Sequence, residues 1–182
     1  PRPVREGDAV NLEGSRVTII EVPGHTPGHV ALVVEGGGRA IVGDSLLNDI
    51  TPHVILDDIR RDPLGEYFRT LRKIQALGTT TALPGHRDYV TDPAGRAAEI
   101  VAHHERRLEE VKGILAGGPA TLYEVAKRMR WKTRGRTWSE LSPYERYFAI
   151  GEALAHLRRL VNMGQAEEIT TSAGVAFRLS RP

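Results

Sequence analysis

The chain has 182 residues and a net charge of +2, 40% of its residues are hydrophobic, and it contains no cysteine. This composition is typical of a soluble globular protein with one ordinary domain or two small ones. The lack of cysteine excludes disulfides and thiolate metal ligands and is compatible with the cytosol. Every apolar run is too short to cross a bilayer, so we expect a cytoplasmic protein without a membrane partner.

The first predicted elements are β-strands. Residues 17–22 and 30–34 are β-type runs, and the Pro- and Gly-rich segment 23–29 between them predicts a tight loop. Gly14 and residues 36–38 mark turns on either side of this pair. The runs are more continuously apolar than a strand with one solvated face requires, so both faces of the sheet are expected to be buried.

Three predicted strands end in a side chain that can bind a metal ion. His25 lies in the Pro- and Gly-rich loop, and Asp44 and His86 each follow an apolar run. A histidine held at a strand end is either a structural histidine or a metal ligand, and the two further strand ends favour the ligand. Imidazole nitrogen and carboxylate oxygen together suit zinc, manganese or iron, and neutral imidazoles leave the ion acidic enough to activate water.

These motifs resemble those of the metallo-β-lactamase superfamily. The resemblance rests on three segments in the same order and rough spacing: Pro23-Gly24-His25-Thr26-Pro27-Gly28-His29, Gly43-Asp44-Ser45-Leu46 and Leu83-Pro84-Gly85-His86. It implies an α/β fold, of which this chain supplies half of the αββα metallo-β-lactamase architecture. The same resemblance implies that His25 ligates one metal ion, Asp44 bridges two ions and His86 ligates the other. It gives His29 no ligand role and adds no catalytic residue beyond the ligands.

One motif that the resemblance implies is missing. A His-x-His-x-Asp-His ligand motif is expected upstream of the 23–29 loop, and residues 1–22 contain none. We therefore expect a truncated chain, the C-terminal part of a longer protein. The intact protein is expected to bind two zinc ions, with manganese or iron as alternatives. This chain alone is expected to bind one ion weakly or none and to be inactive.

A missing partner sheet has a consequence of its own. Without it the chain would expose a contiguous apolar face, which soluble monomers seldom do. We therefore expect either the missing N-terminal half of the catalytic domain as a partner, or self-association.

An irregular loop, residues 45–58, follows Asp44 near the mouth of the expected site. Its His53, Asp57 and Asp58 either contact substrate or are solvated loop side chains, and the second interpretation is the commoner one for such residues.

Two helices with apolar stripes follow. Asp62-Pro63 and Asp92-Pro93 predict their first residues, and Gly78 ends the first helix. His104 lies on the apolar stripe of the second helix, which predicts burial. His103 points in another direction, so the two adjacent histidines form a poor chelate.

Residues 96–182 are predicted to form a second domain after a first domain of residues 1–95. Thr121 with Glu124 and Ser142 with Glu145 are capping boxes that start helices. Residues 166–170 and 175–179 then predict a terminal β-hairpin. Three helices and a hairpin resemble a winged helix, similar to the C-terminal module of lactamase-β-like hydrolases that include endoribonucleases.

A basic segment joins the two capped helices of this domain. Residues 1–95 carry a net charge of −3 and residues 96–182 a net charge of +5, so the second half could attract polyanions. The segment offers cations and an aromatic ring for phosphates and bases of RNA: Lys127, Arg128, Arg130, Trp131, Lys132, Arg134 and Arg136. The alternative is a solvated basic loop in which Trp131 and Trp138 anchor a small core.

Two functional hypotheses follow. The first is a metal-dependent hydrolase in which a metal-bound hydroxide attacks an ester, thioester, lactone or phosphodiester. The second is an RNA-binding module that uses the basic winged-helix region and carries a vestigial metal site.

Overall fold

The computed structural model describes residues 3–54, 61–172 and 174–181. The chain folds into two compact units, Pro1–Pro52 with Gly65–His103 and His53–Leu64 with His104–Pro182. The chain passes from the first unit to the second within one long helix, α2 (Pro93–Leu115). A domain boundary between residues 95 and 96 stays a prediction.

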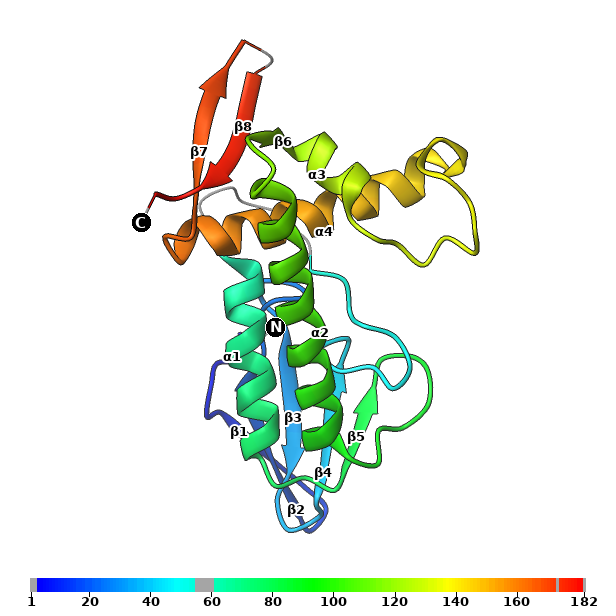
Figure 1. Ribbon diagram of the computed structural model, residues 1–182. Coiled ribbons are helices and arrows are strands. Elements are labelled where there is room, and N and C mark those ends of the chain that lie inside the picture. Colours follow the sequence, from blue (N-terminus) through cyan, green and yellow to red (C-terminus); the bar gives the residue numbers. More distant parts are fainter. Residues whose placement is uncertain (1–2, 55–60, 173, 182) are drawn as a thin grey trace. The chain divides into compact units, whose positions relative to one another are not determined.

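The first unit is built on a five-stranded sheet with the strand order β1-β2-β3-β4-β5. Its strands are β1 (Ala9–Leu12), β2 (Ser15–Glu21), β3 (Val30–Val34), β4 (Arg39–Gly43) and β5 (Thr81–Pro84). The first four pair antiparallel through short connections. β5 pairs parallel with β4 because helix α1 (Pro63–Ala76) lies in the connection between them (Figure 1). The predicted α/β class and its strands are confirmed.

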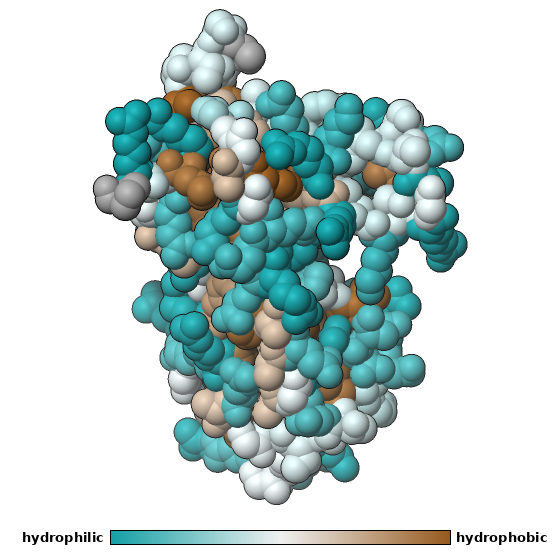
Figure 2. Space-filling view, in the orientation of Figure 1, coloured by the Kyte–Doolittle hydropathy of each residue, from teal (hydrophilic) through white to brown (hydrophobic). Residues whose placement is uncertain are grey.

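One face of this sheet is closed by helices. The side chains that alternate onto it are almost fully buried, namely Ile20, Ala31, Ala40, Val42 and Ala82. Helix α1 and the first turns of α2 lie along the sheet (Figure 1), and α1 contributes the buried side chains of Tyr67, Leu71 and Ile74. Hydrophilic residues predominate on the outward side of these helices (Figure 2). The apolar stripe of α1 therefore packs on the sheet, as predicted.

The opposite face of the sheet is apolar and partly exposed. Val10, Leu12 and Ile41 alternate onto it and are 49%, 57% and 46% exposed. A shallow hollow of about 590 Å³ lies over strands β1 to β4 on this side. Val17 and Ile19 alternate onto the same face and are only 8% and 3% exposed, so its exposure is partial. A missing partner sheet stays a prediction.

The second unit combines helices with a small sheet. After α2 come β6 (Ala120–Thr121), α3 (Leu122–Arg128), the 3-10 turn η1 (Trp138–Glu140), α4 (Pro143–Asn162), β7 (Ala166–Thr171) and β8 (Gly174–Leu179). The three strands are antiparallel in the order β6-β8-β7. No helix in the described part of the chain has the length and apolar character needed to span a membrane.

Both predicted capping boxes are present. The Thr121 side chain accepts the backbone N–H of Glu124, and the Glu124 carboxylate accepts the N–H of Thr121 at 2.7 Å. Ser142 and Glu145 repeat this exchange at the start of α4. These reciprocal bonds satisfy backbone donors that the first turn of a helix leaves free, which is why local sequence predicts both helix starts.

A pair of buried histidines joins α2 to α4 inside the second unit. His104 and His156 are 1% and 0% exposed, and His104 Nδ1 lies 3.1 Å from His156 Nε2. His156 Nδ1 lies 2.7 Å from the carbonyl oxygen of Glu152, which can only accept. His156 therefore carries its proton on Nδ1 and accepts from His104 through Nε2. His104 is buried, as its place on the apolar stripe predicts.

Candidate metal centre

The three predicted ligands meet at one edge of the five-stranded sheet. Strands β2, β4 and β5 run in the same direction, so the segments that follow them lie at the same edge. His25 Nε2 lies 3.8 Å from Asp44 Oδ2, and His86 Nδ1 lies 3.0 Å from Asp44 Oδ1. The Asp44 carboxylate thus stands between two imidazoles, each contributed by a different segment.

The Asp44 carboxylate is suited to a cation. Its Oδ1 atom is buried and accepts no hydrogen bond from the described residues, because the nearby His86 nitrogen is within ion-pair distance but not in hydrogen-bond geometry. A buried oxygen left in this state is costly, and a bound metal ion would satisfy it. Two imidazole nitrogens and a carboxylate also form a donor set that zinc, iron and manganese accept.

The three side chains do not by themselves make a closed metal site. Among the described residues, no group of three or more potential ligands is arranged to hold an ion. The donor types of the three residues suit a metal ion, but their arrangement does not by itself form a site, and further ligands would be needed to complete the coordination.

Gly85 makes room for the Asp44 carboxylate. A Cβ atom at residue 85 would lie 2.8 Å from Asp44 Oδ1, closer than van der Waals contact allows. Glycine between β5 and His86 therefore permits the histidine and the aspartate to approach each other.

His29 has a structural role in this arrangement. Its Nδ1 lies 3.3 Å from Thr26 Oγ1 and its Nε2 lies 3.3 Å from the carbonyl oxygen of Val42. The ring thereby connects the 23–29 loop to the end of β4. Both nitrogens face protein partners, which is consistent with the absence of a ligand role.

Helix α1 holds two of the ligand-bearing segments in place. Thr70 Oγ1 donates a hydrogen bond to the carbonyl oxygen of Pro23 at 2.7 Å, and Tyr67 Oη donates to that of Ser45 at 2.9 Å. Tyr67 is fully buried, and burial raises the pKa of its phenol, so the phenol stays protonated as a donor. Nothing in the local sequence around Tyr67 indicates which carbonyl oxygen its hydroxyl reaches.

Two arginines support the rim of the centre. Arg96 of α2 donates to the carbonyl oxygens of Leu47 and Ile50 at 2.8 and 3.0 Å, which fixes the segment after Asp44. Arg87 follows His86 directly and has a φ of +73°, a left-handed conformation that costs a non-glycine residue about 1 kcal/mol. Its Nη1 atom lies 3.4 Å from Asp49 Oδ2. Sequence analysis missed both residues.

Of the other candidates in the 45–58 loop, the structure describes His53. The ring of His53 contacts Phe148 with 4.7 Å between centroids, inside the second unit. Asp57 and Asp58 lie outside the described residues.

The two tryptophans near the basic segment have partners within the second unit. Trp131 donates its indole N–H to the carbonyl oxygen of Ala126 at 2.7 Å, and the Arg107 guanidinium lies 4.4 Å from its ring centroid. Trp138 donates to Tyr123 Oη at 2.9 Å. This arrangement favours the interpretation in which both indoles anchor a packed loop.

The basic side chains of this segment differ in their contacts. Arg136 forms a two-point ion pair with Glu145, and Arg128 Nη2 donates to the carbonyl oxygen of Ile114 at 3.2 Å. The remaining four cations are exposed, namely Lys127, Arg130, Lys132 and Arg134. RNA binding by the segment stays a prediction.

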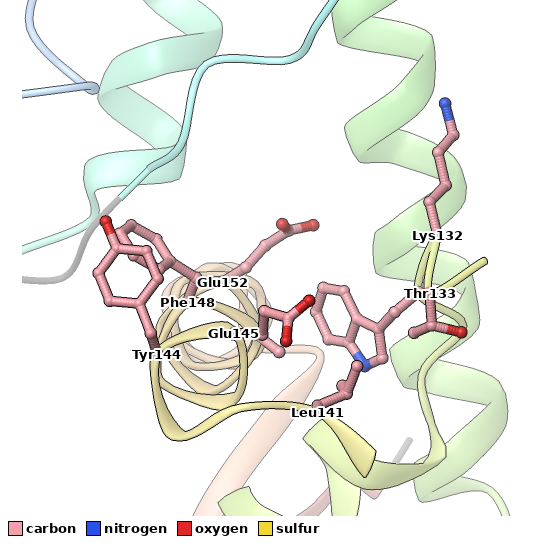
Figure 3. A pocket seen from close by; sticks show the side chains of 9 residues that line it. Lys132, Thr133, Leu141, Tyr144, Glu145, Phe148 and Glu152 are labelled. Atoms are coloured by element: carbon pink, nitrogen blue, oxygen red, sulfur yellow. The ribbon is translucent and has the colours of Figure 1, made fainter. Parts of the chain in front are cut away.

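A cleft of about 260 Å³ lies beside Trp131 and is lined by Leu141, Tyr144, Phe148 and two glutamates of α4. Lys132 extends away from these α4 side chains, so its ammonium does not offset the two carboxylates (Figure 3). Burial raises the pKa of one of them, Glu152. Both carboxylates are ion-paired with arginines of the second unit, Glu145 with Arg136 and Glu152 with Arg107.

Two family models match the chain. Residues 1–86 match the model described as "Metallo-beta-lactamase superfamily", and residues 108–179 match "Metallo-beta-lactamase-like, C-terminal domain". Among curated proteins, the chain is 30% identical over 175 residues to the "Probable metallo-hydrolase YqjP" of Bacillus subtilis (strain 168). This match covers 93% of the chain and 50% of that protein. It is 32% identical over 105 residues to the "Atrochrysone carboxyl ACP thioesterase AacuM" of Aspergillus aculeatus, which covers 58% of the chain and 31% of that protein.

Solved structures of beta-lactamase-type proteins are also similar to this chain, over nearly its whole length. A beta-lactamase domain protein from Burkholderia ambifaria is 32% identical with a TM-score of 0.89, over 98% of this chain and 52% of that one. A metallo-beta-lactamase family protein from Thermus thermophilus is 31% identical with a TM-score of 0.81, over 98% and 54%. The chain thus spans about half the length of these two proteins and of the Bacillus relative. With the ligand motifs and the fold in agreement, the chain belongs to the metallo-beta-lactamase superfamily.

Proposed function

We propose that this chain supplies His25, Asp44 and His86 to the metal centre of a hydrolase that acts on an acyl ester or thioester. The observation that carries the proposal is the position of the Asp44 carboxylate between two imidazoles. Its buried Oδ1 lies 3.0 Å from His86 Nδ1, and its Oδ2 lies 3.8 Å from His25 Nε2. The relative named as a thioesterase supports this substrate class. Lactones and phosphodiesters remain alternatives within the superfamily, because the fold alone does not select a substrate.

The three residues would share the work of holding the metal. His25 and His86 would each contribute an imidazole nitrogen, and Asp44 its carboxylate, to a zinc, manganese or iron centre. When bound, the metal supplies Lewis acidity, which lowers the pKa of a water ligand and polarises the scissile carbonyl. Thr70 and Tyr67 keep the ligand-bearing segments fixed through their bonds to the carbonyl oxygens of Pro23 and Ser45.

We also propose that the partly exposed face of the five-stranded sheet is covered by further polypeptide that carries a second apolar sheet. Exposure of Leu12 and Ile41 at 57% and 46%, and relatives about twice as long as this chain, support the proposal. Such a partner could also supply the ligands that the centre lacks. Association of two copies of the chain through the same face is the outcome expected when no such partner is present.

The second unit is proposed to be a winged-helix domain. The succession α2, α3 and α4, followed by the β7–β8 hairpin with β6 as a third strand, supports this assignment. A fold of this kind does not itself imply nucleic-acid binding.

The experiment that tests the hydrolase is elemental analysis after purification without chelator. It compares this chain with the longest product of its gene. We expect about two ions of zinc, manganese or iron per molecule of the longest product, as in a two-metal site, and at most a fraction per molecule of this chain. His25→Ala and Asp44→Asn should each lower the content, and His103→Ala serves as the control on α2. Metal-free protein from every version would overturn the proposal.

A further inference from the structure

We propose that Arg87 binds an anionic group of the substrate, a carboxylate or a phosphate, at the rim of the metal centre. This inference rests on the proposed hydrolase function and narrows its substrates to acyl compounds that carry a negative charge away from the scissile bond.

Arg87 is held in a short, closed loop beside a ligand. Ala82 and Val90 exchange two backbone hydrogen bonds of 2.8 and 2.9 Å, which close the chain around the exposed residues 85–89. Within this loop Arg87 follows His86 directly. Its side chain is therefore carried by the same rigid backbone that presents the histidine.

The guanidinium has donors to spare. Among the described residues its charged partner is Asp49, reached by one nitrogen at 3.4 Å, and the two side chains are 50% and 55% exposed. An arginine fork carries five N–H donors and can bind a carboxylate or phosphate through two of them at once. Asp49 thus orients the side chain without saturating it. The segment that bears Asp49 is itself fixed by Arg96.

Stability does not explain an arginine here. An exposed ion pair of this kind contributes little to folding, whereas the φ of +73° at residue 87 disfavours every side chain relative to glycine. Strained backbone of this type is concentrated at functional sites, where another requirement maintains it. Folding therefore gives no reason for an arginine at this position.

The charge pattern of the sequence indicates a role for Arg87. The three predicted ligands lie in residues 22–29, 44–50 and 85–89. Arg87 is the one lysine or arginine in these segments, which also contain Asp44, Asp49 and Asp88. Arg96, from α2, already uses its donors on carbonyl oxygens. Arg87 is therefore the cation that these segments offer to a substrate anion.

The inference can be tested without catalysis by measuring anion binding. The protein is first treated with a chelator that removes its metal. Amide signals of residues 85–89 are followed by NMR while acetate, and separately methyl phosphate, is added. We expect saturable shifts that Arg87→Gly weakens at least about tenfold, since a charge-assisted hydrogen bond is worth a factor of this size. Arg87→Lys, which keeps the charge but loses the fork, should be intermediate. The arm with the stronger binding identifies the anion as carboxylate or phosphate.

Folding and general charge are controlled by the choice of variants. Glycine suits the left-handed conformation, so Arg87→Gly should unfold at no lower temperature than the unaltered protein. Arg16 is a matched control because it also forms an exposed ion pair, with Glu35 at 3.0 Å and with exposures of 58% and 51%. Arg16→Ala should leave the anion titration unchanged. Equal binding by Arg87→Gly, or no binding by the unaltered protein, would overturn the inference.

An activity measurement separates this inference from the proposed function. In the longest product of the gene, Arg87→Gly should lower kcat/KM for a thioester with a terminal carboxylate about tenfold more than for its neutral counterpart. Turnover of both with an unchanged ratio would refute the role of Arg87 and leave the hydrolase intact. No turnover of any ester or thioester would count against the hydrolase, while the NMR titration would still decide the anion site.

Discussion

Gly85 shows how a single missing side chain shapes the metal centre. Its absent Cβ leaves the space that Asp44 Oδ1 occupies, at 2.8 Å from where that atom would lie. Gly24 has a similar role in the 23–29 loop, where a Cβ would lie 2.5 Å from the Cβ of Tyr67. Both glycines belong to motifs on which the family resemblance rests. The structure shows why each position needs a residue without a Cβ atom.

We expect Gly85→Ala to impair metal binding more than folding. The added methyl group would displace the Asp44 carboxylate, and a disturbed ligand typically costs about 10- to 100-fold in metal affinity. Metal titration with a competing chelator measures the effect. Gly28→Ala is the matched control, since a Cβ there meets nothing within 4 Å. If both variants bind metal as the unaltered protein does, Gly85 does not shape the site.

Gly24→Ala should instead destabilise the fold, by about 3 kcal/mol. The backbone at Gly24 has a φ of +131°, and the new Cβ would meet the Cβ and Cα atoms of Tyr67 at 2.5 and 2.6 Å, which cannot move without moving α1. Urea unfolding gives the free energy. Gly14→Ala has a positive φ of +84° but open space, so it should cost only the backbone term of about 1 kcal/mol. Equal costs for the two variants would rule out the steric explanation.

At the scale of elements, the second unit depends on its capping boxes. Hydrogen bonds lower the pKa of the Glu145 carboxyl from an ordinary 4.5 to about 2. The bond from Arg136 has the largest effect, and those from the backbone and side chain of Ser142 come next. The Thr121 and Thr137 groups lower the pKa of Glu124 and Glu140 in the same way. Each carboxylate therefore favours the folded state only while it is ionised.

Acid should destabilise the second unit within a defined window. Because the folded-state pKa of Glu145 lies below the unfolded value, its contribution is complete above about pH 4.5 and is lost as the pH falls toward 2. Thermal unfolding followed by circular dichroism from pH 5 to 2 should show this loss, and Glu145→Gln should reduce the slope. Glu13→Gln, in an exposed turn of the first unit, removes a carboxyl that caps no helix. The same slope in both variants would contradict the capping explanation.

At the level of the whole molecule, the partly exposed sheet face is the surface through which we propose that the chain associates. The helix side of the sheet is closed by α1 and α2, whereas Val10, Leu12 and Ile41 remain about half exposed on the other side. Contiguous apolar exposure of this kind favours contact with another apolar surface, whether a partner polypeptide or a second copy.

We expect the isolated chain to self-associate through this face. Sedimentation velocity should show a weight that rises with concentration, and Ile41→Glu should shift the distribution toward monomer because a carboxylate resists burial. Val175→Glu is the matched control, since Val175 is 52% exposed on β8 of the second unit. A monodisperse monomer before substitution would show that the face needs no cover.

Features that depend on neighbouring residues could be predicted before the structure was known. Strand periodicity, Pro and Gly punctuation and reciprocal caps predicted β1 to β5, both long helices and the starts of α3 and α4, because these signals act within a few residues. The ligand roles of His25, Asp44 and His86 came from the resemblance of their motifs to a known family and stay predictions. β6 was not predicted because its two residues are a strand only through their pairing with Phe177 and Ala176.

Contacts between groups that are distant in the sequence became known from the three-dimensional fold. The approach of His25 and His86 to one carboxylate depends on the common direction of β2, β4 and β5. The His104–His156 contact joins residues 52 positions apart, and the Arg87–Asp49 pair joins residues 38 apart. Local propensity carries no information on such distances, which are set by strand register and by the packing of helices.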